Sequence, residues 1–237
     1  MTERVYIKQL LAGRDFARRD AVAAQMVNFV YLIGDREARE CLLVDPAWDV
    51  KGILDVCARD EMRVTGVLAT HYHPDHIGGD LFGRAIEGLA ALKELLDVPV
   101  HVNRAEAEGV RLMTGMTAGD LMLHDGGDEV LAGEVPVRLV HTPGHTPGSQ
   151  CFLVSGQALV SGDTLFVQGC GRVDLPGGDS DEMYRTLTQR LAKLPDDVLL
   201  LPGHDYAENP TSTMGEQKQR NACMRISSIE DWRQFMG

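Results

Sequence analysis

Four short segments of the chain carry side chains of the kinds that bind metal ions. The first is 70–76, which reads THYHPDH, and the others end in His145 (TPGH), Asp163 (GD) and His204 (PGH). Each segment follows a short apolar run, where a strand would pass into a loop. The potential ligands are His71, His73, Asp75, His76, His145, Asp163 and His204. The pattern predicts a metalloenzyme.

The first segment has the spacing of a metal-binding turn. His71 and His73 are separated by one residue, which places both imidazoles on the same side of an extended or tightly turned segment. Asp75 and His76 continue through the turn, which Pro74 stiffens by fixing its φ angle. The donors are nitrogen and oxygen without thiolate, a set that suits zinc, iron, manganese or nickel with a position left for water. The site is therefore predicted to be catalytic.

Composition limits the class of protein. The chain has 237 residues, of which 44% are apolar, and shows no linker or internal repeat, so we expect one domain over 1–237. The formal net charge is -12 and the basic residues are scattered, which argues against a nucleic-acid partner. Charged residues interrupt 1–20, and no apolar run approaches the roughly 18 residues of a membrane span. We expect a soluble, cytoplasmic protein that binds no membrane.

The order of apolar runs predicts the secondary structure. Strands are expected at 5–11, 26–33, 41–44, 67–69, 98–102, 137–140, 151–154, 158–160 and 198–201. Helices are expected at 49–59, 104–113 and 229–236, and a further helix is expected to begin after a cap at Asp179. The stretch 77–96 is expected to form a helix that its glycines break. Strands in two groups flanked by helices indicate two sheets packed face to face between helical layers.

The potential ligands, in this order, resemble the signature of the metallo-β-lactamase superfamily, and the resemblance covers nearly the whole chain. It implies an α+β fold, the αβ/βα sandwich, in which two mixed β-sheets lie between helical layers and metal ions bind at the edge of the sheets. It also implies how the ligands divide. The first ion would be bound by His71, His73 and His145, the second by Asp75, His76 and His204, with Asp163 as the bridge.

Three further segments resemble one branch of that superfamily, which contains glyoxalase II and the persulfide dioxygenases. They are 141–149 (HTPGHTPGS), 162–166 (GDTLF) and 169–175 (GCGRVDL). Glyoxalase II implies two Zn²⁺ ions that hold a hydroxide, which attacks a thioester carbonyl while Asp75 and Asp163 orient it. Because every ligand for two ions is present, we predict a thioesterase similar to hydroxyacylglutathione hydrolase.

Two alternatives use the same residues. A persulfide dioxygenase would hold one Fe²⁺ through His71, His145 and Asp163 and would oxidise glutathione persulfide. Mixed iron and zinc is also compatible with the ligands. An acyl-homoserine lactonase would present a strained ester to the same hydroxide, and the ligands do not discriminate among carbonyl substrates.

Cys170 and Arg172, which follow Asp163 in the sequence, are predicted to bind substrate. Cys170 and Arg172 would line the pocket, where the guanidinium would receive a substrate carboxylate. The alternatives are a packed thiol for Cys170 and a structural salt bridge for Arg172. We expect His141 to pack or hydrogen-bond beside the site rather than bind metal. The predicted partner is a small molecule, such as a thioester or glutathione conjugate; a dimer is compatible with the sequence, which sets no oligomeric state.

Overall fold

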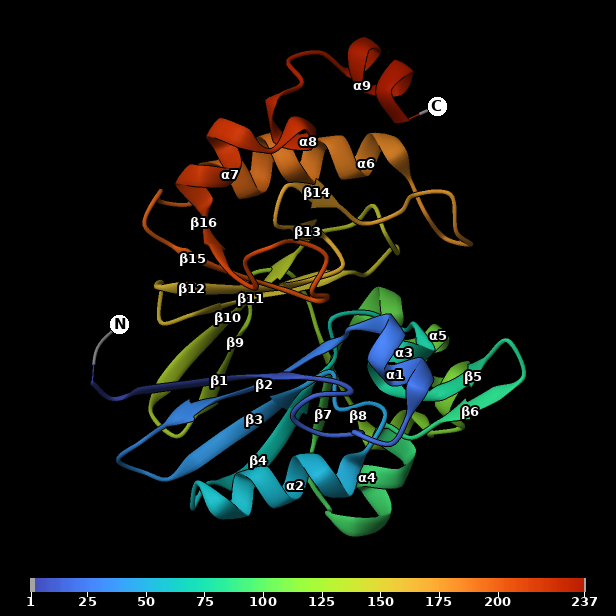
Figure 1. Ribbon diagram of the computed structural model, residues 1–237, viewed down its shortest axis with the longest axis vertical. Helices are drawn as coiled ribbons and strands as arrows, with labels where there is room; N and C mark the ends of the chain where they lie inside the picture. The colour runs from blue at the N-terminus through green and yellow to red at the C-terminus, as the bar shows by residue number, and fades with distance from the viewer. Residues whose placement is uncertain (1–2, 237) are drawn as a thin grey trace.

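Two β-sheets face each other at the centre of the molecule, and helices cover the outer face of each (Figure 1). A computed structural model describes residues 3–236. The strand order is β1-β2-β3-β4-β7-β8 in the first sheet and β16-β15-β12-β11-β10-β9 in the second. This arrangement confirms the predicted αβ/βα sandwich. No helix among these residues has the length and apolar character needed to cross a bilayer.

The first sheet is built entirely from residues 5–124. Its strands are β1 (Val5–Leu11), β2 (Phe29–Asp35), β3 (Glu40–Val44), β4 (Arg63–Leu68), β7 (Val100–Asn103) and β8 (Leu121–His124). The first three pair antiparallel, and β3, β4, β7 and β8 pair parallel. Parallel neighbours need crossover connections. These carry α2 (Val50–Arg59), α4 (Leu89–Leu95) and α5 (Ala107–Thr114), while α1 (Ala21–Met26) precedes β2.

The second sheet comes from the second half of the chain. Its strands are β9 (Glu129–Ala132), β10 (Val135–His141), β11 (Gln150–Val154), β12 (Ala158–Gly162), β15 (Leu199–Pro202) and β16 (Ser212–Thr213). The crossover from β12 to the parallel β15 holds a two-stranded sheet, β13 (Leu165–Phe166) and β14 (Gly169–Cys170), and then α6 (Ser180–Arg185). The helical path continues through a π-helical turn at Thr186–Arg190, and α7 (Met214–Arg220), α8 (Ala222–Arg225) and α9 (Ile229–Met236) complete the outer layer.

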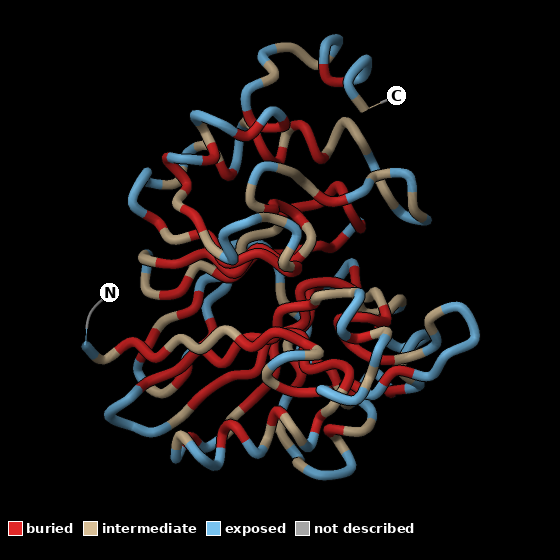
Figure 2. The backbone as a smooth tube through the Cα atoms, in the orientation of Figure 1, coloured by how far each residue is buried: buried red, intermediate tan, exposed pale blue. Residues whose placement is uncertain are grey.

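Both faces of the central strands are buried, which explains their unbroken apolar runs (Figure 2). On β2, Phe29, Tyr31 and Ile33 pack between the two sheets, whereas Val30 and Leu32 face the helices of the first layer. The alternation follows from side chains that point to opposite faces of a strand. A third core lies between the second sheet and its helices. The sheets are therefore held at a fixed distance from each other, and loops at their shared edge are fixed as well.

The predicted broken helix at 77–96 is wrong in its first half. A short helix, α3 (Pro74–Ile77), ends at Gly78, whose φ of +83° lies in the left-handed region that glycine tolerates. A hairpin of β5 (Gly79–Leu81) and β6 (Arg84–Ile86) follows before α4. Gly78 and Gly83, which would weaken a helix, instead adopt positive φ angles at the turns before and within this hairpin. The hairpin stands away from the body of the molecule (Figure 1).

The remaining predicted elements are confirmed to within a few residues, with one shifted start. The strand predicted at 26–33 begins only at Phe29, because residues up to Met26 belong to the helix α1, which was not predicted. Asp20 caps this helix by accepting hydrogen bonds from the backbone N–H groups of Val22 and Ala23. The predicted cap at Asp179 is present, where the side chain accepts a hydrogen bond from the N–H of Glu182.

Candidate metal centre

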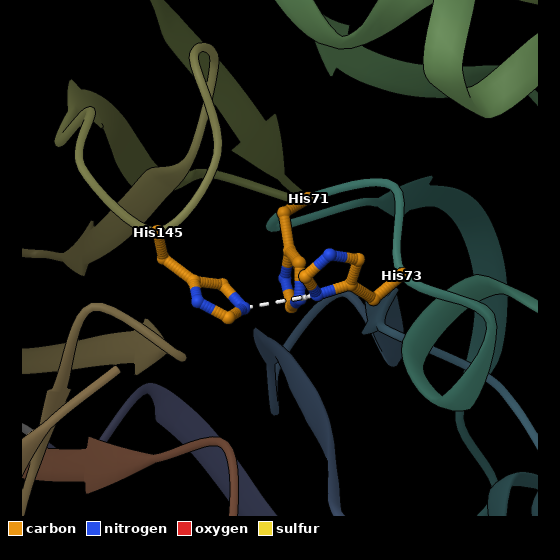
Figure 3. A group of neighbouring side chains, drawn as sticks. All are labelled: His71, His73 and His145. Carbon is orange, nitrogen blue, oxygen red and sulfur yellow. Dashed lines mark hydrogen bonds between the residues drawn. The ribbon is translucent and has the colours of Figure 1, made fainter. Parts of the chain in front are cut away.

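All the predicted ligands meet at one edge of the two sheets. The loop after β4 carries His71 and His73, and α3 carries Asp75 and His76. The second sheet supplies the others, which follow strands β10, β12 and β15: His145, Asp163 and His204. Figure 3 shows His71 and His73 reaching His145 across the boundary between the two halves of the chain. The strand ends thus bring together residues that are far apart in the sequence.

Three imidazoles form the first ligand group. Nε2 of His71 lies 3.1 Å from Nδ1 of His73, and that atom lies 2.9 Å from Nε2 of His145 (Figure 3). Donors around a tetrahedral zinc ion with bonds of about 2.0–2.1 Å are separated by roughly 3.3 Å. The group therefore has nearly the spacing that one shared ion requires.

Two imidazoles and a carboxylate form the second group. The Nε2 atoms of His76 and His204 are 3.2 Å apart, and Oδ2 of Asp75 lies 3.4 Å from each of them. All three side chains are buried. This spacing also matches that of donors around a single ion.

Asp163 lies between the two groups. Its Oδ1 is 3.2 Å from Nε2 of His76, and its Oδ2 is 3.4 Å from Nε2 of His204 and 3.7 Å from Nε2 of His145. Oδ1 is buried and, among residues 3–236, has no hydrogen-bond partner. A buried carboxylate oxygen without a partner is costly unless a cation satisfies it. This orphaned oxygen and the donor set both fit a pair of metal ions.

The outward nitrogen of three ligands is fixed by an acceptor. Nδ1 of His145 donates to the carbonyl oxygen of Arg172 at 2.7 Å, and Nδ1 of His204 donates to that of Met26 at 2.7 Å. Because a carbonyl only accepts, Nδ1 carries the proton and the lone pair of Nε2 points into the centre. Nδ1 of His76 lies 2.9 Å from a carboxylate oxygen of Asp45, which has the same effect.

The protonation of the two groups differs. Burial, with the neighbouring imidazoles, lowers the pKa of His71 well below its usual value and that of His73 to about 4, so both are neutral at pH 7, the form that binds metal. Burial alone would lower the pKa of His76, but Asp163 and Asp75 outweigh it and hold that pKa well above its usual value. The carboxylates of Asp75 and Asp163 therefore favour a positive charge beside them, at the position of His76.

The comparison with known proteins agrees with this geometry. The profile of the "Metallo-beta-lactamase superfamily" matches residues 25–204. The chain belongs to the metallo-beta-lactamase superfamily. It is 37% identical over 208 residues to a hydroxyacylglutathione hydrolase from Polaromonas sp. strain JS666, with 86% of this chain and 73% of the relative covered. It is 32% identical over 218 residues to the mitochondrial persulfide dioxygenase ETHE1 of Homo sapiens, with 89% and 76% covered.

A solved structure shows the same relationship. ETHE1 from Myxococcus xanthus superposes with a TM-score of 0.79 at 30% identity, covering 98% of this chain and 89% of that one. The family is thus established, and the clusters of histidine and aspartate side chains have the arrangement that could hold metal ions. The relatives of this metallo-beta-lactamase-fold chain thus include both a hydrolase and a dioxygenase.

Two polar residues that support the ligands were not predicted. Asp45 accepts hydrogen bonds from the backbone N–H and hydroxyl of Thr70, at 2.8 and 2.6 Å, besides contacting His76. Nδ2 of Asn28 donates to Oδ2 of Asp75 at 3.0 Å, and Nε1 of Trp48 donates to Oδ1 of Asn28 at 3.1 Å. Asp45 directly follows a buried strand at the edge that carries the ligands, and this position is a signal that sequence analysis could have used.

A buried glutamate joins the two loops that carry the first group. Oε2 of Glu106 accepts a hydrogen bond from the N–H of Tyr72 at 2.8 Å, between His71 and His73 in the sequence. Its Oε1 accepts from the Thr146 hydroxyl at 2.8 Å and from the N–H of Gly148 at 2.6 Å, beside His145. Glu106 therefore fixes the loop of the first sheet against that of the second.

Replacing Asp45 by asparagine is expected to weaken zinc binding about 10- to 100-fold, because the variant loses the anionic acceptor that orients His76. Competition with a chromophoric chelator measures this affinity. Asp55→Asn, at an exposed position on α2, is the matched control and should bind zinc as the parent does. Equal affinities for the parent and Asp45→Asn would show that Asp45 does not position the ligand.

Three other predicted residues lie around the centre. His141 contacts no ligand atom through its Nε2, which lies 2.9 Å from the carbonyl oxygen of Pro147 instead. Arg172 lines the cavity above the ligands and also forms a two-bonded pair with Asp174, at 2.9 and 2.7 Å. Cys170 is not among the residues that line this cavity, and the neighbouring thiol of Cys223 raises the pKa of the Cys170 thiol.

A cavity of about 420 Å³ opens directly above the ligands. Ligands of both groups line its floor, among them His73, His145 and His204. Its walls are mainly apolar side chains, contributed by Met26, Leu81, Phe82, Phe166, Leu175, Pro176 and Tyr206. The metallo-beta-lactamase-fold centre is thus open to a small molecule on one side and closed by the two sheets on the other.

Proposed function

We propose that the chain is a hydrolase that uses two metal ions, preferably zinc, to cleave a thioester. The position of Asp163 supports this most directly. One of its oxygens lies 3.2 Å from Nε2 of His76 and the other 3.7 Å from Nε2 of His145, so a single carboxylate reaches both ligand groups. Both groups also keep a full set of donors, which an enzyme with two ions requires.

In this proposal the residues hold the ions and orient the reacting atoms. One ion would be held by His71, His73 and His145 and the other by Asp75, His76 and His204, and Asp163 would be shared. A pair of bound ions lowers the pKa of water, so that a nucleophile is available at neutral pH. Asp75, which Asn28 holds at 3.0 Å, orients that nucleophile toward a carbonyl carbon in the cavity. A lactone, such as an acyl-homoserine lactone, presents the same kind of carbonyl.

A mononuclear iron persulfide dioxygenase is the second candidate. The 32% identity to the human persulfide dioxygenase ETHE1 favours it. In this chain His71, His145 and Asp163 form a set of two histidines and one carboxylate, which suits oxygen-activating Fe²⁺. The second ligand group would then serve only to position these residues, and the substrate would be glutathione persulfide.

The substitution Asp75→Ala distinguishes the two candidates. In the hydrolase it is expected to lower thioester cleavage at least about 100-fold and to reduce the metal content from about two ions per chain to about one, because Asp75 belongs to the second group. Elemental analysis and a thioester assay measure both effects, and Asp197→Ala, at an exposed position, is the control. One iron per parent chain, and oxygen uptake with glutathione persulfide that survives Asp75→Ala, would instead establish the dioxygenase.

A further inference from the structure

The wall of the cavity indicates what kind of molecule it accepts. Phe166 and Tyr206 pack edge to face with ring centroids 5.1 Å apart, and the Tyr206 ring stacks on His204 at 4.7 Å. Leu175 and Pro176 belong to the loop that follows β14, and they too line the cavity. An apolar group lying against these side chains would leave water, which favours its binding. The surface beside the metal ligands is therefore suited to a hydrocarbon chain or ring.

The walls of the cavity offer few cationic side chains to an anionic ligand. Among the residues that line it, Arg172 is the only lysine or arginine, and its Nε and Nη2 already bind Asp174. Asp80 adds a negative side chain to the lining, and the whole chain has a net charge of -12. Glutathione carries two carboxylates and one ammonium group, and apart from Arg172 the lining offers no lysine or arginine for the carboxylates. An uncharged thiol needs no such partners.

The β5–β6 hairpin places one more apolar residue at the cavity. Phe82, at its turn, is 100% exposed and has a φ of +53°, a strained backbone conformation for a residue other than glycine. With Leu81 it forms the outer wall of the cavity. An exposed aromatic ring on a strained turn does not stabilise the folded protein. The Phe82 ring would be buried only when an apolar ligand lies between it and the cavity.

We propose that the site takes thioesters with an apolar acyl group of moderate length and an uncharged thiol, and that Phe82 covers the acyl group from outside. This inference rests on the proposed hydrolase. The acyl chain lies along Phe166 and Tyr206 with its carbonyl above the metal ligands. In the reaction the oxygen of water bonds to the carbonyl carbon and the carbon–sulfur bond breaks. The products are a carboxylate, a free thiol and one proton.

The test compares two series of thioesters with the zinc-loaded protein. Acetyl, butyryl, hexanoyl and octanoyl esters of N-acetylcysteamine carry an uncharged thiol, and the same acyl esters of glutathione carry a charged one. We expect kcat/KM to rise at least tenfold from acetyl to octanoyl, and to be at least tenfold higher for N-acetylcysteamine than for glutathione with the same acyl group. Rates that are independent of chain length, or that favour glutathione, would overturn the inference while leaving the hydrolase intact.

Variants locate the effect. Phe82→Ala is expected to remove most of the gain from acetyl to octanoyl, whereas Phe235→Ala, an exposed phenylalanine on α9, should retain it. Binding of the uncleavable thioether S-octyl-N-acetylcysteamine, followed by calorimetry, needs no turnover. If no thioester is cleaved but the thioether binds and Phe82→Ala weakens it at least fivefold, the proposed function fails and the apolar site stands. If the thioether does not bind, the apolar site is wrong.

Discussion

Replacing His145 by alanine is expected to lower kcat/KM at least about 1,000-fold and to reduce metal content. Nε2 of His145 lies 2.9 Å from Nδ1 of His73 and 3.7 Å from Asp163, so its loss removes the only imidazole that the second sheet contributes to the first group. Bound metal ions contribute several kcal/mol of transition-state stabilisation, and every 1.36 kcal/mol is tenfold in rate. Elemental analysis and a thioester assay of the same preparation measure both losses.

His141→Ala is the matched control, because it also removes an imidazole, four residues before His145 in the sequence. The His141 ring contacts the carbonyl of Pro147 and no ligand. We expect its metal content to equal that of the parent and its kcat/KM to fall less than about threefold. Loss of metal in this variant would show that His141 takes part in the centre, and full activity of His145→Ala would refute the ligand assignment.

Removing the metal is expected to lower the midpoint of thermal unfolding by about 10 °C, besides abolishing activity. Without cations the centre holds Oδ2 of both Asp75 and Asp163 3.4 Å from Nε2 of His204, and Oδ1 of Asp163 is buried without a hydrogen-bond partner among the described residues. A ligand present at about 1,000 times its Kd stabilises a protein by about 4 kcal/mol. For a chain of this size each kcal/mol shifts the midpoint by roughly 2–4 °C.

Dialysis against a chelator, followed by calorimetry with and without added zinc, measures this change. Zinc should restore both the midpoint and the activity. His145→Ala serves as the comparison, since its midpoint should respond much less to zinc. An unchanged midpoint in protein shown to be metal-free by elemental analysis would mean that the centre forms equally well without ions.

The candidate ligands can be picked out from the sequence because their signals are local. His71 and His73 stand two residues apart after a strand, and the loops of His145 and His204 each contain the glycine that precedes the histidine. The layered fold was predictable from unbroken apolar runs, because strands buried on both faces need them. These signals require no knowledge of which residues contact one another.

The unpredicted features depend on contacts between distant residues. Asn28 and Glu106 look like ordinary polar residues in the sequence, and only the packed sheets show what they support. The hairpin at 79–86 was mistaken for part of a helix because its apolar residues also repeat at helical spacing, while backbone turns at glycine decide the outcome. The wall of the cavity likewise draws on loops that follow different strands.

Because each sheet is built from one continuous part of the chain, a single cut in the backbone can separate the two sheets. Every strand of the first sheet ends by His124 and every strand of the second begins at or after Glu129, with the exposed Gly127 between them. A cut there gives two fragments, each with one whole sheet. One fragment carries His71, His73, Asp75 and His76, and the other His145, Asp163 and His204. Neither fragment has the complete set for either ion, so we expect each ion to be bound fully only when the two fragments associate.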